Sequence, residues 1–305
     1  MKNLEMWMRA GLFLGLGLVV PACNYGNNYY NGPYSVAWYV DPVGGTDAPG
    51  FGSPGFPFRT IRFALLQALS GDTIFLATGT YSASTETFPI LLKPGVTVIG
   101  DPASSGATTS IVDGGNYTIS GGSQAGSMIN AGVVMASGSS LSGVKISVSG
   151  VGAVFDGANA SLTNCTLTGC GVSGVQVFQS ASPTLASNII TQSGGAGVVT
   201  FDTSAPILRQ NSISSNATDG VLANDSSIPN LGDPLSPGAN TLQSNTQEGL
   251  ANNTAASAIP AAGNTWNSSV QGADTQGHYA AGAANPALVG TNYSMTNSPA
   301  ASIQF

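Results

Sequence analysis

The feature that most constrains the fold is an internal repeat of 23 residues in the middle of the chain. Segments 160–182, 183–205 and 206–228 align without gaps, and several columns hold mostly one residue type. These columns contain Pro183, Pro206 and Pro229; Leu162, Leu185, Leu208 and Leu231; Cys165, Asn188 and Asn211; Gly174, Gly197 and Gly220; and Phe155, Phe178 and Phe201. Repeats of this length indicate a solenoid, in which each unit buries its apolar side chains against its neighbours.

The local pattern inside each repeat indicates short β-strands. Residues 175–177 and 198–200 are short, alternating, valine-rich runs, and such runs are broken by Gly, Asn and Ser. Helical repeats need stretches with a 3.6-residue period, which are missing, and leucine-rich repeats need a Leu spacing that these units lack. Three short strands and three turns fit one unit, and stacked units lie about 4.8 Å apart. The sequence therefore predicts an all-β parallel β-helix with about 23 residues per coil.

Stacking turns each column into a ladder of like side chains. We expect the Leu, Ile, Val and Phe ladders to point inward and form the core. Asn188 and Asn211 precede inward aliphatic residues by two positions, so they should also point inward and bond the turn backbone. Cys165 and Cys170 are five residues apart across an expected turn. An oxidising compartment would allow them to form a disulfide, and buried free thiols are the alternative.

An N-terminal cap is expected before the first coil. Thr60 is a suitable N-cap residue for a short helix, and Gly71 follows the expected end of that helix. The apolar face of this helix consists of Ile61, Ala64, Leu65, Ala68 and Leu69. A solenoid exposes its core at both ends, so we expect this helix to cover the first coil.

Several motifs around the cap and near the end of the coils resemble a known family. They are Tyr39-Val40-Asp41-Pro42, Gly44-Gly45-Thr46-Asp47, Pro57-Phe58-Arg59-Thr60-Ile61, Gly71-Asp72-Thr73-Ile74, Gly79-Thr80-Tyr81 and Gly263-Asn264-Thr265-Trp266. The chain resembles the bacterial family called domain of unknown function 1565, which is similar to pectate-lyase-like right-handed β-helices. The resemblance implies a single right-handed parallel β-helix with a capping helix, and it implies no particular activity.

The first residues have the pattern of an export signal. Lys2 and Arg9 accompany an apolar run at residues 11–20, which is too short to span a bilayer. The run ends in Val20-Pro21-Ala22-Cys23, which resembles the lipobox of bacterial lipoproteins and makes Cys23 the expected lipidation site. An ordinary secretory signal with an unrelated cysteine is the alternative. Asn24 favours, by the same resemblance, the outer membrane or cell surface.

These features predict a domain organisation for the exported chain. We expect a lipoprotein signal peptide at residues 1–22, a tether at 23–35 and a β-helix domain at 36–305. Within that domain, residues 36–90 form the cap and first strands, 91–270 the coils and 271–305 a C-terminal cap. The expected state is a monomer bound to a lipid bilayer through its lipidated N-terminus.

The charged residues argue against several function classes. The formal net charge is −7 and the basic residues are scattered, so nucleic acid is not an expected partner. β-Helix lyases use a Lys or Arg base with Ca²⁺-binding carboxylates, and β-helix glycosidases use Asp pairs. No adjacent Asp pair occurs, the single histidine is His278, and the coils beyond residue 100 contain only Lys145 and Arg209 as bases. We therefore predict no catalytic residues.

One polar column is the candidate site. Asp156, Gln179, Asp202 and Asp225 recur at 23-residue spacing, one residue after the Phe column in three of the coils. If the Phe column points inward, these residues point outward, and Asp202 neighbours Asp225. Adjacent like charges are unfavourable unless a cation or a ligand hydroxyl relieves them, so Ca²⁺ and carbohydrate are the candidate ligands. A solvated strand end is the alternative.

Two function classes follow. The first is a surface-anchored, non-catalytic module that is structural or binds carbohydrate at the cell envelope. The second is a lyase or glycoside hydrolase acting on an envelope or environmental polysaccharide. No cofactor is certain, and Ca²⁺ is the one candidate.

Overall fold

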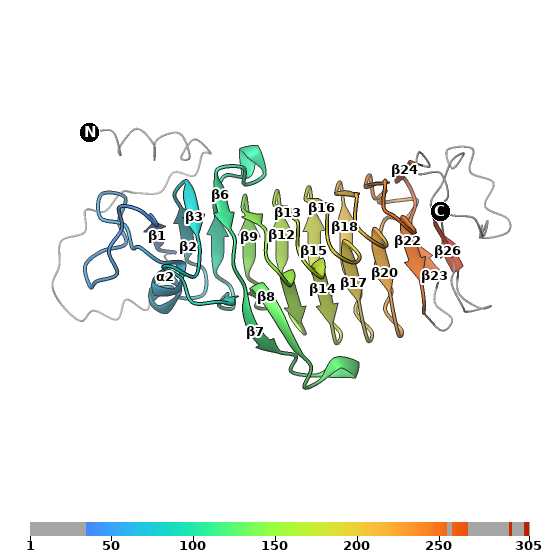
Figure 1. The fold of residues 1–305 in the computed structure, drawn as a ribbon, viewed down its shortest axis with the longest axis horizontal. Coiled ribbons are helices and arrows are strands. Elements are labelled where there is room, and N and C mark those ends of the chain that lie inside the picture. Colours follow the sequence, from blue (N-terminus) through green and yellow to red (C-terminus); the bar gives the residue numbers. More distant parts are fainter. Residues whose placement is uncertain (1–34, 255–257, 268–292, 295–301, 305) are drawn as a thin grey trace.

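The computed structural model describes residues 35–254, 258–267, 293–294 and 302–304, and its strands stack into an elongated parallel β-helix (Figure 1). The coils between residues 73 and 223 each contribute one strand to each of three long sheets. Sheet 1 contains β1 (Ala37–Val40), β2 (Thr73–Leu76), β5 (Thr97–Ile99), β9 (Ser140–Ser142), β12 (Ser161–Thr163), β15 (Thr184–Ala186) and β18 (Ile207–Arg209). Sheet 2 contains β3 (Gly79–Tyr81), β6 (Thr109–Ile111), β10 (Lys145–Ile146), β13 (Thr166–Thr168), β16 (Ile189–Thr191), β19 (Ser212–Ser214), β21 (Thr241–Gln243) and β24 (Thr265–Asn267). Sheet 3 contains β4 (Ile90–Leu91), β8 (Met128–Met135), β11 (Val151–Asp156), β14 (Ser173–Phe178), β17 (Val198–Thr200), β20 (Val221–Ala223), β22 (Leu250–Asn252) and β25 (Tyr293–Ser294).

The remaining elements lie off the parallel ladders of these sheets. β7 (Gly115–Thr118) pairs antiparallel with β8, and β23 (Ala258–Pro260) pairs with β26 (Ser302–Gln304). Short 3₁₀ turns occur at η1 (Pro102–Ser104) and η2 (Gly122–Gln124). The single α-helix among the described residues is α2 (Ile61–Gln67).

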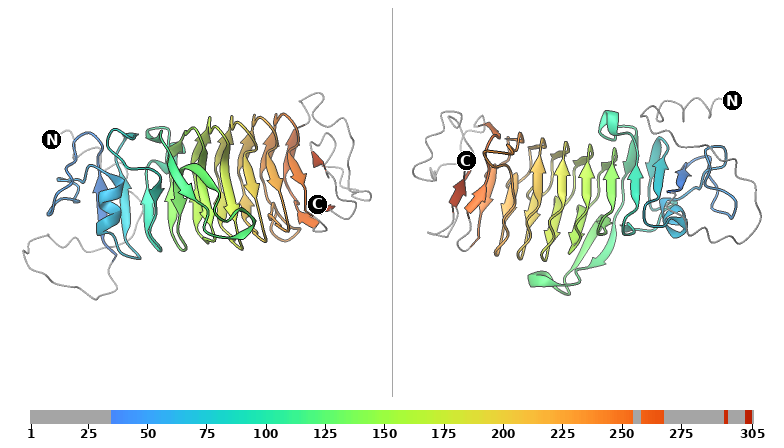
Figure 2. Two further views of the ribbon diagram at one scale, coloured as in Figure 1. Left: turned by 60° about the horizontal axis from the view of Figure 1, so that its bottom comes forward. Right: turned by 180° about the vertical axis from the view of Figure 1, so that it is seen from behind.

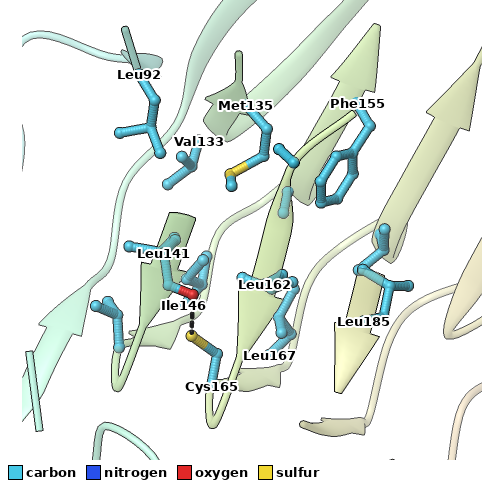
Figure 3. Close-up of a cluster of buried hydrophobic side chains, with 14 of the residues drawn as sticks. Leu92, Val133, Met135, Leu141, Ile146, Phe155, Leu162, Cys165, Leu167 and Leu185 are labelled. Carbon is cyan, nitrogen blue, oxygen red and sulfur yellow. Dashed lines mark hydrogen bonds between the residues drawn. The ribbon is translucent and has the colours of Figure 1, made fainter. Parts of the chain in front are cut away.

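The register of the strands confirms the repeat. Leu162 pairs with Leu185 in sheet 1, and Leu185 pairs with Leu208. These side chains are fully buried, as are Leu167, Ile190 and Ile213 in sheet 2. Figure 3 shows Leu141, Leu162 and Leu185 in successive coils, pointing into the interior. The core is therefore built from ladders of aliphatic side chains, as the sequence predicts.

Asn188 and Asn211 are 1% exposed and form part of an inward ladder, which confirms the prediction. Asn188 Nδ2 donates to the Leu162 carbonyl oxygen at 2.8 Å, and the Asn188 N–H donates to Asn211 Oδ1 at 3.0 Å. The same pattern continues through Asn240 and Asn264. Each amide thus bonds backbone groups that the turn leaves without a sheet partner.

A second Asn ladder runs through the turn between sheets 2 and 3, and the sequence analysis missed it. Asn216 Oδ1 accepts from the Ser193 N–H at 3.0 Å, and Asn216 Nδ2 donates to Asn245 Oδ1 at 2.9 Å. Asn245 Nδ2 donates to the Ile213 carbonyl oxygen at 3.1 Å. Two of the three turns in these coils are therefore fixed by buried amides.

The two cysteines of the coils are free, buried thiols and form no disulfide. Cys165 heads the first Asn ladder, since its N–H donates to Asn188 Oδ1 at 3.0 Å. Cys170 lies in the column of Ser193 and Asn216 at the 23-residue spacing. Burial raises the pKa of Cys165 to about 12 and that of Cys170 to about 11. The thiols therefore act as small core side chains.

The expectation of one inward Phe column is wrong. Phe155 pairs with Val177, because the offset between β11 and β14 is 22 residues instead of 23. Phe155 lies in the interior of the solenoid, whereas Phe178 belongs to a second apolar cluster and stacks on Phe201 with 5.0 Å between ring centroids. Shifting by one residue moves a strand side chain to the opposite face of its sheet. Phe178 and Phe201 therefore lie on the outer face of sheet 3.

The capping helix forms with one change from the expectation. Thr60 Oγ1 accepts from the Phe63 N–H at 3.0 Å, which confirms Thr60 as the N-cap. Ile61, Ala64, Leu65 and Ala68 are buried, but Leu69 is 70% exposed because the helix ends at Gln67. The exposed Leu69 is therefore not part of the capping face.

Several sequence predictions fall outside the described residues. These are the signal peptide, Cys23, the tether up to residue 34, His278 and most of the expected C-terminal cap. In the part that the structure describes, none of the helices is long and apolar enough to cross a membrane.

Candidate functional site

A β-hairpin lies over the outer face of sheet 3 (Figure 2, left). β7 pairs with the first half of β8, from Gly115 opposite Ala131 to Thr118 opposite Met128. We call residues 115–119 and 128–131 the hairpin root and residues 120–127 the hairpin tip. The root packs on sheet 3 through a cluster that contains Tyr117, Ile119, Ile129, Ala131, Val134, Val151, Val154, Phe178 and Phe201.

The four candidate residues, which we call the acidic strip, come together beside this cluster. Gln179, Asp202 and Asp225 occupy the same turn position in successive coils, with φ values of 61°, 58° and 58°. Asp156 lies one position earlier, opposite Phe178, because of the 22-residue offset. Gln179 Nε2 nevertheless donates to Asp156 Oδ1 at 2.6 Å. The strip is therefore continuous across four coils, although Asp156 joins it from the neighbouring column.

The carboxylates of the strip accept hydrogen bonds from the backbone of the preceding coil. The Gln179 N–H donates to Asp202 Oδ2 at 2.7 Å, and the Asp202 N–H donates to Asp225 Oδ2 at 2.9 Å. Bonds from an N–H group to a carboxylate are stronger than neutral ones. The adjacent negative charges are thus stabilised by the protein itself.

The hairpin tip adds further donors to the strip. The Ser123 N–H donates to Asp202 Oδ1 at 2.5 Å, and Ser123 Oγ donates to Asp225 Oδ2 at 2.9 Å. The Ser120 N–H donates to Asp156 Oδ2 at 2.7 Å. Ser120 Oγ also accepts from Gln179 Nε2 at 3.0 Å. The tip therefore contacts all four strip residues through polar groups, and Asp225 remains exposed at the far end.

Two ionisable groups at the root end of the strip have shifted pKa values. Burial opposes the charge of Asp156, but hydrogen bonds from Ser120, Gln179 and Tyr117 outweigh it and lower its pKa. Burial and the hydrogen bond to Asp156 raise the pKa of Tyr117 to about 12. Tyr117 is therefore a hydroxyl donor and Asp156 an anion at neutral pH.

An aromatic ring lies next to the strip. Phe201 precedes Asp202 and is half-buried, and its ring is nearly parallel to the buried ring of Phe178, with an interplanar angle of 1°. The two rings stack with 5.0 Å between their centroids. The site thus combines carboxylates, an amide and a partly exposed aromatic ring.

A family model described as "Protein of unknown function (DUF1565)" matches residues 43–271. The chain belongs to this family. Its description assigns no activity, and no curated protein matches the chain.

Two solved structures of a GH136 lacto-N-biosidase from Eubacterium ramulus are similar to this DUF1565 protein. The native crystal structure has a TM-score of 0.39 and 9% identity, and the match covers 88% of this chain and 68% of that one. The selenomethionine derivative has a TM-score of 0.37 and 10% identity, with the same coverage.

The two bases that the sequence analysis considered lie on other faces of the solenoid. Lys145 lies on β10 in sheet 2 and Arg209 on β18 in sheet 1, whereas the acidic strip follows the strands of sheet 3. Arg209 donates to the Leu208 and Asn230 carbonyl oxygens at 2.9 Å and so fixes the loop at residues 230–238. Arg209 therefore has a structural role. Among the described residues, no three His, Cys, Asp or Glu side chains are grouped to hold a metal ion.

One ionisable residue at the opposite edge of sheet 3 was missed by the sequence analysis. Asp219 precedes β20, whereas Asp225 follows it, so the strand separates Asp219 from the strip. Asp219 is 4% exposed, and burial raises its pKa to about 6 even though the Glu248 N–H donates to its Oδ1 at 3.2 Å. Its column contains Ala196 one coil earlier, which is the sequence signal that could have indicated burial.

Proposed function

We propose that this protein is a surface-anchored, non-catalytic β-helix module that binds polysaccharide at the acidic strip. The observation that carries the proposal is the placement of Gln179, Asp202 and Asp225 beside the partly exposed ring of Phe201. Sugar hydroxyls donate to carboxylates, and the apolar face of a sugar ring packs against aromatic rings. A row of such groups at a spacing of one coil suits an extended polymer.

The charge of this face supports a neutral or amino-sugar polymer. The described strands of sheet 3 carry no Lys or Arg, while Asp156, Asp202 and Asp225 lie along one edge. Lys93, which follows β4 at that edge, donates to the Leu66 and Ala68 carbonyl oxygens of the cap. The negative charge of these carboxylates would repel a polymer of uronic acids and attract a polymer with protonated amino groups.

The test is binding to soluble polysaccharides, measured by affinity electrophoresis and titration calorimetry. The panel includes glucan, xylan, chitosan and polygalacturonate. Asp202→Asn combined with Asp225→Asn keeps the size of the side chains but removes their charge, and we expect at least tenfold weaker binding. Asp233→Asn, which makes the same change in the loop at residues 230–238, is the matched control. Equal affinity of the double variant and the wild type would refute the site.

Membrane anchoring is part of the same proposal. It is supported by the apolar run at residues 11–20 that ends at Cys23. We expect the protein to partition with membranes and Cys23→Ser to release it or leave the precursor unprocessed. Mass spectrometry that finds an unmodified mature N-terminus at another residue would contradict the anchor.

Asp219 favours a second candidate function, a glycoside hydrolase. A carboxylic acid with a pKa of about 6 can act as a general acid near neutral pH, and Glu248 of the next coil is the carboxylate next to it in the column. A reducing-sugar assay on the same panel tests this alternative. Activity that is lost in Asp219→Asn and kept in the strip double variant would replace the binding proposal.

A further inference from the structure

The hairpin over sheet 3 has two parts that are held by different forces. At the root, Ile119 is 1% exposed and packs with Val151 and Phe178 in the outer apolar cluster. At the tip, the contacts with the strip that the structure shows come from the polar groups of Ser120 and Ser123. Polar bonds at the surface exchange readily with water or with another donor, whereas buried apolar contacts do not.

Glycines allow the tip to lie directly on the strip. A Cβ at Gly121 would lie 2.9 Å from the amide carbon at the end of the flexible Gln179 side chain, and one at Gly122 would collide with the carboxylate of Asp202. Gly122 also has a φ of +74°, which favours glycine. Gly126 has a similar φ of +81°, but a side chain there would meet no other group within 4 Å. Close approach to the strip is therefore specific to Gly121 and Gly122.

The tip also makes the type of contact that the proposed ligand would make. The Ser123 hydroxyl donates to the Asp225 carboxylate, and Gln179 Nε2 donates to the Ser120 hydroxyl at 3.0 Å. A sugar hydroxyl can replace either serine hydroxyl, because it donates and accepts in the same way. The tip and a polysaccharide cannot occupy these groups at the same time.

We propose that the hairpin tip is a displaceable strap that closes the polysaccharide site of the acidic strip. This inference rests on the proposed function. Polysaccharide hydroxyls replace Ser120 and Ser123, the tip lifts from Gln179, Asp202 and Asp225, and the root stays packed on sheet 3. The strap therefore lowers the affinity for ligand by the cost of its own displacement.

Gly122→Ala and Gly126→Ala form a matched pair that tests the strap. Both remove a glycine with positive φ, but only the change at Gly122 forces a methyl group onto Asp202. Deuterium exchange of the backbone amides reports opening of the tip without ligand. We expect Gly122→Ala to speed exchange at Ser120 and Ser123 and to leave the Ile119 amide protected. We also expect this variant to bind cellohexaose or glucosamine hexasaccharide several-fold more tightly than the wild type. Gly126→Ala should match the wild type in affinity and in exchange at Ser120 and Ser123. Ser123→Ala, which removes one bond without a steric change, should shift both measurements in the direction of Gly122→Ala.

A second measurement separates the strap from the binding function. In the wild type saturated with hexasaccharide, exchange at Ser123 should become faster while Ile119 stays protected. If the wild type binds the sugar and exchange at Ser123 is unchanged or slower, the strap is wrong and the binding function stands. Weaker binding by Gly122→Ala would also overturn the strap, because the tip would then be part of the binding surface. If neither hexasaccharide binds to the wild type or to Gly122→Ala, both proposals fail.

Discussion

The backbone N–H of Asp202 donates a hydrogen bond to the carboxylate of Asp225 in the next coil, with 2.9 Å between N and Oδ2. This bond answers a question that the sequence raises, namely how two acidic residues can stack on adjacent coils. Carboxylates tolerate this position when N–H donors face them. Because the Gln179 N–H donates in the same way to Asp202, the repeating backbone supplies one donor per coil.

Calcium should therefore add little stability at the strip. Ca²⁺ binds six to eight oxygen ligands, and the carboxylate oxygens of Asp202 already accept from Ser123 and Gln179. We expect millimolar Ca²⁺ to leave the melting temperature unchanged relative to protein treated with chelator. A rise that disappears when Asp202→Asn and Asp225→Asn are combined would instead establish a calcium site.

The buried Asn ladder should contribute strongly to stability. Asn211→Leu removes the acceptor of the Asn188 N–H and the donor to the Leu185 carbonyl oxygen. We expect a loss of about 2–6 kcal/mol, since two buried groups lose their partner and each costs about 1–3 kcal/mol. Urea unfolding monitored by circular dichroism measures it, with Ser212→Ala on the outer face as the control. A midpoint equal to that of the control would be inconsistent with the ladder.

The cysteine thiols should be inaccessible in the folded protein. Burial raises the pKa of both groups well above neutral, and only the thiolate reacts. In a chain carrying Cys23→Ser, we expect Ellman's reagent to detect neither Cys165 nor Cys170 at pH 8 and to detect both after denaturation. A reductant should not change the melting temperature. Failure to detect thiols in the denatured, unreduced protein would reveal a disulfide.

The repeat made most of the fold predictable from the sequence. Like residues stack in a solenoid, so the alignment of Leu162, Leu185 and Leu208 is also their spatial register. The same reasoning correctly placed Asn188 and Asn211 in the interior. Thr60 was predictable because the capping of a helix depends on local sequence alone.

The site was less predictable, for two physical reasons. The coil between β11 and β14 is one residue short, which reverses the direction of Phe178 relative to Phe155 and cannot be seen in residue types alone. The hairpin is an insertion with no counterpart in the repeat, so nothing in the sequence pattern indicates that Ser120 and Ser123 reach the strip. The column of strip residues could be identified from the sequence, but the hairpin tip that lies over it could not.

Asp219 should make the protein more stable in mild acid. Its pKa is about 6 in the folded protein and near 3.8 in an unfolded chain, so the folded state binds the proton more tightly. The resulting stabilisation is fully present below about pH 4 and is lost as the pH rises through about 6. The contribution is at most about 3 kcal/mol, because one pKa unit corresponds to about 1.4 kcal/mol.

Asp219→Asn keeps an acceptor for the Glu248 N–H but cannot ionise, so we expect it to be more stable than the wild type at pH 7.5. The difference between the two proteins should shrink towards pH 4, measured by urea unfolding across this range with Asp233→Asn as the control. A difference that does not change with pH would show that Asp219 titrates alike in the folded and unfolded chains.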